Sequence, residues 1–282
     1  MKRFLMMLSV TIAANLPATT IHWFCAPKGQ HVMDNQAPMD AGFRFELGVF
    51  RNGFVPTTDN QAVWADHWVA AQRVVYHAGN QWFTAVHEVE DNADAFAVGT
   101  NAYIWGFHGG PEDGEWILFR KSSWRWPRAN PGFPIAREWY AAEADEVLIG
   151  DVGGVASYHL RSRRVQNLTP PTTTWQQWLT ETDAEPGPER ILEYATGSEH
   201  PRLTMTRDEK GQVLLHVPKR ADRPANLWLE VSEDLVSWKP LSGQAALLQQ
   251  TPTGLIFARD FLGGEDTPEE NLLFFRFKVA LP

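Results

Sequence analysis

The chain has 282 residues, of which 44% are hydrophobic and 12% aromatic, and its formal net charge is −9. This composition is that of a globular chain rather than a disordered one, and the length suits one large or two ordinary domains. The acidic balance argues against nucleic acid and anionic membranes as partners, because both select basic surfaces. Cys25 is the only cysteine, which excludes an intrachain disulfide and a cysteine-rich metal site.

The N-terminus has the order of a secretory signal. Lys2 and Arg3 precede an apolar run of eleven residues, FLMMLSVTIAA, and the polar NLPATT follows. This run is too short for a transmembrane segment, which needs about 20 apolar residues. We therefore expect a signal peptide and leader over 1–26, ordered structure from near Phe43, and a secreted or cell-envelope location. The alternative is a core strand or helix at the N-terminus.

A β-hairpin is the clearest structural signal in the chain. AYIWGF (102–107) and EWILFR (115–120) are short apolar runs, and the loop HGGPEDG between them breaks both helix and strand. Side chains alternate across a strand, so both faces of this hairpin are apolar. The hairpin should therefore lie centrally in a sheet that is covered on both sides.

The hairpin belongs to an expected N-terminal β domain over 43–165, which is a sandwich or barrel-like. FRFELGVF (43–50) alternates apolar and polar residues, as a half-buried strand does. Trp64 and Trp68 recur at a helical step and predict a short amphipathic helix over 60–72.

A linker is expected over 166–201, where Pro and Thr are frequent and short helices can form. It resembles the calcium-binding linkers of the thrombospondin type 3 or dockerin-like kind in secreted bacterial proteins, through Ile191, Leu192, Glu193, Tyr194, Ala195, Gly197 and Pro201. The family's three acidic ligand positions are held here by Thr182, Ala184 and Pro186, and Arg190 stands where the family has Asn. Calcium needs about six to eight oxygen ligands. The resemblance therefore implies the joint and its helix but argues against the metal.

The remaining residues, 202–282, read as short strands separated by turns, which predicts an Ig-like or fibronectin-like β-sandwich. LEVSEDLVSWKPL and FFRFKVALP also resemble the C-terminal β-sandwich module that follows such linkers in those secreted proteins. The stretch that begins FELGVFRNGFVPTTDN is similar to an uncharacterised N-terminal module of the same proteins. The expected fold is mainly β, with two antiparallel β domains joined by a short helical linker.

Ionisable residues give no compelling catalytic pattern. His67, His77 and His87 fall at ten-residue steps, but no HxH or HExxH spacing brings them together, so we predict no metal and no cofactor. Two acidic clusters are either solvated or catalytic carboxylates: Glu88, Glu90 and Asp91, and Glu112, Asp113 and Glu115.

The segment SSWRWP holds the candidate ligand-binding residues. Trp124 and Trp126 would share one face of a strand, where exposed indoles could stack on sugar rings while Arg125 supplies hydrogen bonds. The alternative is that both indoles are core. The first functional hypothesis is a non-catalytic secreted or cell-surface binding or structural protein, with a polysaccharide or envelope component as partner. The second is a secreted hydrolase that uses loop carboxylates such as Glu88 and Glu115.

Overall fold

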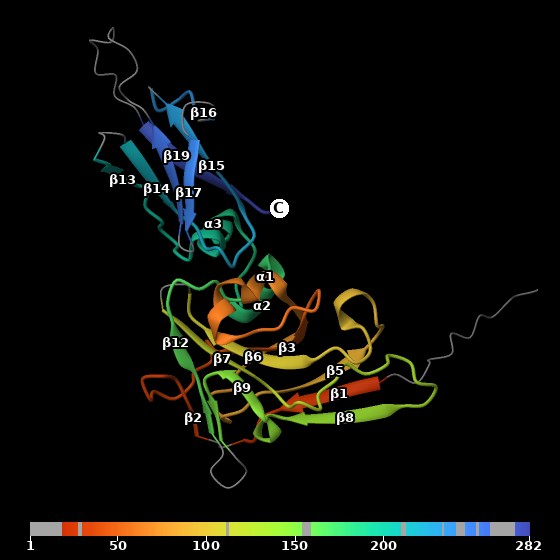
Figure 1. Cartoon of the computed structure of the whole chain (residues 1–282). Coiled ribbons are helices and arrows are strands. Elements are labelled where there is room, and N and C mark those ends of the chain that lie inside the picture. Colours follow the sequence, from red (N-terminus) through yellow and green to blue (C-terminus); the bar gives the residue numbers. More distant parts are fainter. Residues whose placement is uncertain are drawn as a thin grey trace, which may run out of the picture.

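The computed structural model of the chain describes residues 19–27, 30–110, 113–153, 159–209, 213–232, 234–240, 246–251, 254–259 and 274–282. Strands account for 44% of the chain and helices for 15%, so the fold is mainly β, as predicted. The strands fall into two groups that share no sheet (Figure 1), an N-terminal β region within 19–165 and a C-terminal β region within 204–280. No helix within the described ranges is long and apolar enough to cross a membrane.

The N-terminal β region is built on a six-stranded antiparallel sheet in the order β12-β7-β6-β3-β4, with β9 paired to β7 as well. The strands are β3 (Arg44–Phe50), β4 (Trp68–Val75), β6 (Ala102–His108), β7 (Gly114–Arg120), β9 (Glu146–Ile149) and β12 (Arg163–Val165). β6 and β7 form the predicted hairpin, in which Ile104 faces Phe119 and His108 faces Glu115. The hairpin occupies the centre of this sheet, as its two apolar faces require.

Each face of the central sheet is covered by its own apolar cluster. Ile104, Ile117 and Phe119 point into one cluster, and Trp105 and Trp116 point into the other. The alternation along β6 and β7 therefore sorts the side chains between two cores. The second cluster is rich in aromatic residues and is formed by Phe50, Trp64, Trp68, Tyr103, Trp105, Phe107, Trp116, Leu118 and Val165.

The helix predicted over 60–72 is wrong in length. A 3-10 helix (Thr58–Val63) leads into a single α-helical turn, α1 (Trp64–His67), and β4 begins at Trp68. Trp64 and Trp68 do share the aromatic cluster, so their spacing correctly indicated a common side. The strand replaces the helix after Trp68 because the run to Val75 pairs along its length with β3.

A second sheet has the order β5-β1-β8. It packs on the apolar cluster that contains Ile104, Ile117 and Phe119. Its strands are β1 (Thr19–Phe24), β5 (Thr84–Val89) and β8 (Ile135–Tyr140). β1 is the middle strand, with Ile21 and Trp23 fully buried. Ordered structure is therefore present before Phe43, where it was expected to begin, and β1 lies inside the leader expected over 1–26; residues 1–18 lie outside the described ranges.

Two strand pairs in the N-terminal β region are parallel, unlike the antiparallel arrangement that was expected. β1 pairs in parallel with β8. β2 (Gln30–Val32) pairs in parallel with β11 (His159–Arg161), which also pairs with β10 (Asp151–Val152). Short 3-10 helices at Asp94–Phe96 and Ala141–Glu143 complete this region.

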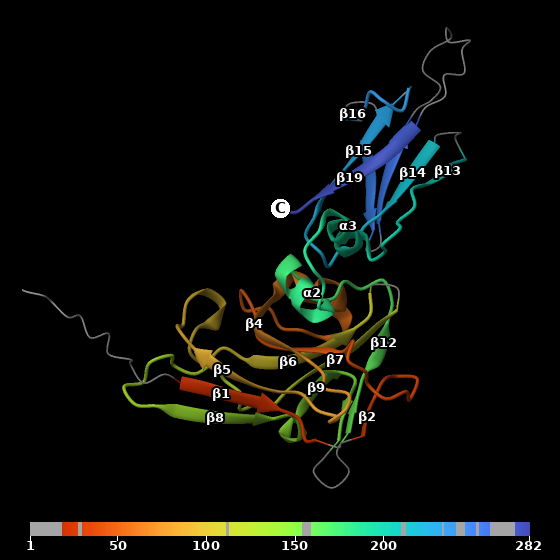
Figure 2. The same ribbon diagram turned by 180° about the vertical axis from the view of Figure 1, so that it is seen from behind.

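Two helices follow, α2 (Trp175–Thr182) and α3 (Pro188–Thr196), where the sequence predicted a helical linker. Thr174 caps α2 by accepting a hydrogen bond from the Gln177 amide, and α3 begins with a proline, which suits the first turn of a helix. Gly197, with φ of 79°, ends α3 in the left-handed conformation that favours glycine. Both helices lie between the two β regions (Figure 2).

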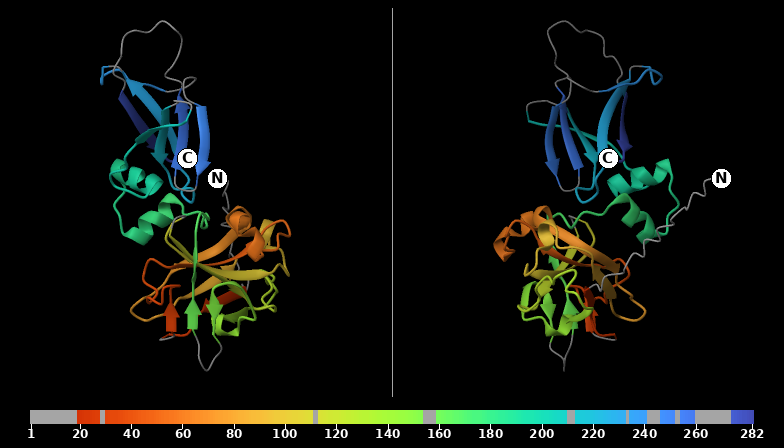
Figure 3. Two further views of the ribbon diagram at one scale, coloured as in Figure 1. Left: turned by 60° about the vertical axis from the view of Figure 1, so that its left-hand side comes forward. Right: turned by 90° about the vertical axis from the view of Figure 1, so that its right-hand side faces the viewer.

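The C-terminal β region consists of two antiparallel sheets that lie face to face (Figure 3). One has the order β13-β14-β18-β17 and the other β16-β15-β19. The strands are β13 (Thr204–Arg207), β14 (Val213–Pro218), β15 (Asn226–Ser232), β16 (Lys239–Pro240), β17 (Ala246–Thr251), β18 (Gly254–Arg259) and β19 (Phe274–Ala280). Leu215, Val217, Leu229 and Leu255 are buried between them.

Candidate functional site

The two tryptophans that were candidates for sugar stacking are core residues. Trp124 and Trp126 are each 2% exposed and belong to the first apolar cluster. Trp124 stacks on Trp139 with ring centroids 5.6 Å apart. The segment is a loop rather than a continuous strand, and both indoles turn inward. The proposed Trp platform is therefore wrong, and the alternative core interpretation is correct.

Arg125, between these tryptophans, points the other way. It is exposed, and its guanidinium donates a hydrogen bond to the side-chain oxygen of Asn101, with which it also forms a β-bridge. This places Arg125 on the rim of a surface hollow of about 500 Å³, which we call the loop groove. The loop groove is lined by residues 50–55, 94, 95, 97, 99–101, 103 and 125.

The loop groove owes its shape to a tight turn after β3. Asn52 and Gly53 adopt positive φ values of 58° and 68°, which Asn and Gly tolerate best. This Asn-Gly turn brings Arg51 and Phe54 to one wall of the groove. The segment that ends at Asn101 also lines the groove.

The loop groove carries two arginines that lack an acidic partner. Arg51 donates to the carbonyl oxygen of Asp66 at 2.5 Å and Arg125 to Asn101, and neither forms an ion pair in the described part of the chain. Asp94 is the one carboxylate among the lining residues. The groove is therefore net positive on a chain whose total charge is −9.

Aromatic side chains give the loop groove an apolar lining. Phe54 stacks on His67 with centroids 4.1 Å apart, and Tyr103 lies beneath the Arg120 guanidinium at 5.3 Å. Burial raises the pKa of Tyr103, so its phenol stays neutral. Val55 is 66% exposed at the rim. The groove thus combines apolar surface with guanidinium and amide donors.

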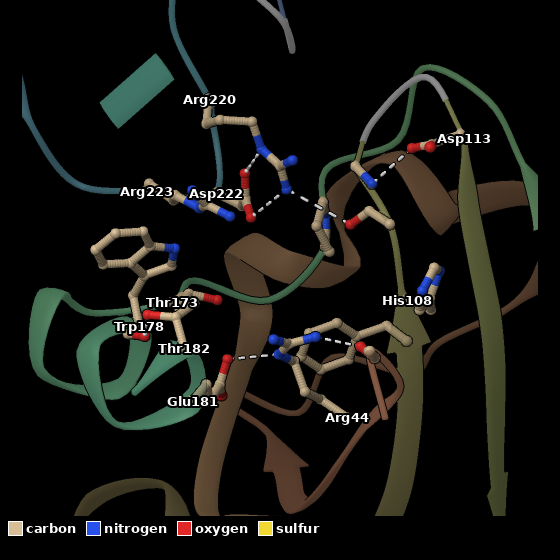
Figure 4. A pocket seen from close by; sticks show the side chains of 15 residues that line it. Arg44, His108, Asp113, Thr173, Trp178, Glu181, Thr182, Arg220, Asp222 and Arg223 are labelled. Carbon is tan, nitrogen blue, oxygen red and sulfur yellow. Dashed lines mark hydrogen bonds and ion pairs between the residues drawn. The ribbon is translucent and has the colours of Figure 1, made fainter. Parts of the chain in front are cut away.

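A second hollow, the junction pocket, has a volume of about 250 Å³ and lies where the two β regions and the linker meet (Figure 4). Arg220, Asp222 and Arg223, from the loop between β14 and β15, lie on one side of it. Arg44 of β3 and Glu181 of α2 lie on the opposite side. The pocket is therefore assembled from segments that are far apart in the sequence.

Buried ion pairs fix α2 against the central sheet beside the junction pocket. The Arg73 guanidinium lies 2.6 Å from a carboxylate oxygen of Glu46 and 3.5 Å from one of Glu181, which is also paired with Arg44 at 2.5 Å. The Trp68 indole donates to Glu46 as well, at 2.5 Å. Burial raises the pKa of Glu46, while Arg73 and Trp68 act in the opposite direction.

The carboxylates predicted as catalytic candidates lie apart from one another. Glu115 is 8% exposed and accepts hydrogen bonds from the Ser162 hydroxyl at 2.6 Å and the Asp34 amide at 3.1 Å, which indicates a structural role. Asp113 accepts from the Gly110 amide in the β6–β7 turn, and Glu112 lies outside the described ranges. Glu88 lies elsewhere, on β5.

Glu88, Glu90 and Asp91 line a third hollow of about 400 Å³, the acidic groove, together with His87 and the Trp126 ring. His87 contacts Trp126 with centroids 5.5 Å apart, and burial lowers the His87 pKa.

The three histidines at ten-residue steps do not converge. The His67 ring stacks on Phe54, and the His87 ring contacts Trp126. His77 forms a backbone β-bridge with Trp82. Among the described residues, no group of three or more His, Cys, Asp or Glu side chains is placed to hold a metal ion.

Several residues that shape these sites carry no recognisable signal in the sequence. Arg51 and Asn101 flank predicted elements, but no local pattern connects them with Arg125. Arg44 alternates with apolar neighbours and so looked like a solvent-facing strand residue, and Arg223 lay in a predicted turn. In the linker, Glu193 is paired with Arg190 at 2.5 Å.

Comparison with protein-family models, with curated proteins and with solved structures finds no match for this chain.

Proposed function

We propose that the protein is a non-catalytic binding protein of the cell exterior and that its loop groove holds a segment of a polysaccharide. The observation that supports this function most directly is the pair of arginines, Arg51 and Arg125, which form no ion pair with any described residue and lie beside the aromatic lining of the groove. Export is inferred from Lys2 and Arg3, the apolar run FLMMLSVTIAA that follows them and the polar NLPATT after it, within the signal peptide and leader expected over 1–26.

The chemistry of the loop groove suits a sugar chain. Guanidinium and amide groups exchange hydrogen bonds with hydroxyl groups, and a guanidinium binds a carboxylate through two parallel bonds. Aromatic and aliphatic carbons suit the apolar faces of sugar rings. A volume of about 500 Å³ lies within the usual range of ligand sites, about 300–1,000 Å³. An acidic polysaccharide should bind more tightly than a neutral one, because the groove is net positive.

The same groove is poorly equipped for hydrolysis. Glycosidases use a pair of carboxylates on opposite sides of the scissile bond. Asp94 is the single carboxylate in the lining of the loop groove. Glu115, the candidate catalytic carboxylate on the hairpin, accepts hydrogen bonds from the Ser162 hydroxyl and the Asp34 amide. These arrangements favour binding over turnover.

Binding of acidic and neutral polysaccharides, measured by affinity electrophoresis and calorimetry, tests the proposal. We expect binding of at least one acidic polysaccharide, and we expect Arg51→Gln/Arg125→Gln to weaken it at least tenfold. Arg164 is an exposed arginine of β12, and Arg164→Gln likewise removes one positive charge. This control variant should leave the affinity unchanged. The absence of binding across the panel, or equal affinity in the double variant, would contradict the proposal.

A hydrolase remains the second candidate, because the acidic groove gathers carboxylates at one hollow. Glu88, Glu90 and Asp91 are exposed and form no ion pair within the described ranges. Turnover of a glycoside or ester panel that is lost in Glu88→Gln would favour this candidate. A chain that binds polysaccharide without releasing products would support the binding function instead.

A further inference from the structure

Arg223 is an unusual cation at the edge of the junction pocket. Its guanidinium carbon lies 5.9 Å from the ring centre of Trp178 and 5.8 Å from that of Tyr194. One terminal nitrogen donates to the carbonyl oxygen of Tyr194 at 3.0 Å. The Nε atom is buried and has no hydrogen-bond partner within the described ranges. A guanidinium that is partly removed from water and left without an anion is costly, so it favours an anionic ligand.

The acidic side chains around Arg223 are already engaged. Asp222 accepts two bonds from Arg220, at 2.7 and 2.8 Å, so its charge is balanced by that neighbour. Glu181 is paired with Arg44 and Arg73 on the opposite side of the pocket.

Asp113 completes the acidic lining of the junction pocket, and it lies across the pocket from Arg223 in Figure 4. There its carboxylate accepts a hydrogen bond from the amide of Gly110. Burial, followed by the nearby charge of Arg220, lowers the pKa of Arg223, while Asp222 and Tyr194 act in the opposite direction.

We propose that the junction pocket binds a small carboxylate that carries hydroxyl groups, with Arg223 as the anchor for the carboxylate. Arginine binds carboxylates through a planar fork of two donors. The lining also includes apolar residues such as Phe107 and Pro170, while His108, Thr173 and Thr182 offer atoms that can accept hydrogen bonds from hydroxyl groups. A cavity of about 250 Å³ suits a small organic acid rather than a polymer. This site is separate from the loop groove and does not depend on it.

A matched pair of probes isolates the role of the charge. D-gluconate and sorbitol have the same carbon skeleton, but only gluconate carries a carboxylate. Calorimetry with the full chain at constant ionic strength should give one bound gluconate and at least tenfold weaker binding of sorbitol. Equal binding of the two probes, or no binding of gluconate, would overturn the proposal.

Variants then locate the site. Arg223→Gln removes the cation and should weaken gluconate at least tenfold. Arg223→Lys keeps the positive charge but loses the planar fork of donors, and it should weaken gluconate binding several-fold. Arg164→Gln and Arg125→Gln should bind gluconate as the wild type does. Wild-type affinity in both Arg223 variants, or loss of gluconate binding in Arg125→Gln, would overturn the assignment to this pocket.

Discussion

The two β regions of this chain are stabilised by cores of very different kinds. The N-terminal region buries an aromatic cluster on one face of its central sheet and a larger mixed cluster on the other. The C-terminal region has four buried residues in its core among those described, and they are Leu and Val side chains. Its phenylalanines on β18 and β19 are partly buried. Stability from apolar burial should therefore be concentrated in the N-terminal region.

This difference shows why the contacts around the linker matter. The C-terminal region is attached through backbone bonds from Arg220 to Ala195 at 2.8 Å and from Thr173 to Asp222 at 2.8 Å. The Tyr194 phenol adds a bond to the Thr173 carbonyl oxygen at 2.7 Å. These hydrogen bonds to the linker add to the stability of the small C-terminal core. We expect two unfolding transitions, and the C-terminal region should unfold at the lower temperature.

Trp105→Ala should have the largest effect on this comparison. Trp105 is fully buried and contacts Trp64, Trp68 and Trp116 at centroid distances of 4.9–5.8 Å. Loss of a buried tryptophan costs about 4 kcal/mol. We expect the N-terminal transition to shift by this amount in chemical denaturation followed by tryptophan fluorescence.

Leu215→Ala is the matched change in the other core, since Leu215 is also fully buried. It should cost about 3 kcal/mol and move only the C-terminal transition. If either variant shifts both transitions equally, the chain unfolds as one cooperative unit and the comparison of two cores fails.

Acid should act on the N-terminal region through His31. This side chain is 4% exposed and hydrogen-bonds to the Tyr76 hydroxyl at 2.9 Å. Burial, aided by the charge of His159, lowers the His31 pKa to about 4. The folded state therefore favours neutral His31, and this stabilisation is complete above pH 6.5 and is lost as the pH falls towards 4.

The expected loss between these pH values is about 3 kcal/mol, from a difference of about 2.5 pKa units. Unfolding free energies at pH 7 and pH 4.5 check this for the wild type and for His31→Gln. The variant should show a shallower dependence on pH. Identical slopes in the two proteins would show that His31 does not control the acid response.

Gly110→Ala should have the smallest effect, and it tests the contact between the regions. A Cβ atom at this position would lie 2.8 Å from a terminal nitrogen of Arg220, which is held in place by Asp222. We expect a cost of about 1 kcal/mol, seen as a lower C-terminal transition temperature. Gly79→Ala is the control, because nothing lies within 4 Å of its added Cβ. Equal behaviour of the two variants would argue against a tight contact at Arg220.

Local pattern predicted the elements whose partners are close in sequence. The hairpin of β6 and β7 was predicted from two apolar runs on either side of a glycine-rich loop. Because both faces of these strands are apolar, the sequence also predicted that both faces are covered. The helix over 60–72 was predicted too long, because the four-residue step between Trp64 and Trp68 is equally satisfied by a turn followed by a strand. The pairing of β4 with β3 decided between them.

Features that depend on distant pairing were beyond local pattern. The loop groove joins Arg51 and Arg125, which approach only because β3 and β6 are neighbours and Asn101 bridges to Arg125. Arg125 was named as a binding residue for its tryptophan neighbours, yet it lines the groove because those neighbours turn inward. Arg223 likewise gained its surroundings from helices that precede it by about 30 residues or more.

The central position of β1 has a consequence for the order in which the chain can fold. Thr19 of β1 pairs with Val89 of β5 and with Ile135 of β8. β2 pairs with β11, which lies still later in the sequence. A nascent chain exposes these early strands long before their partners are made. Closure over such sequence distances slows folding and leaves unpaired strands open to aggregation. Among the described strands, β1 is therefore synthesised early and completes its pairing late.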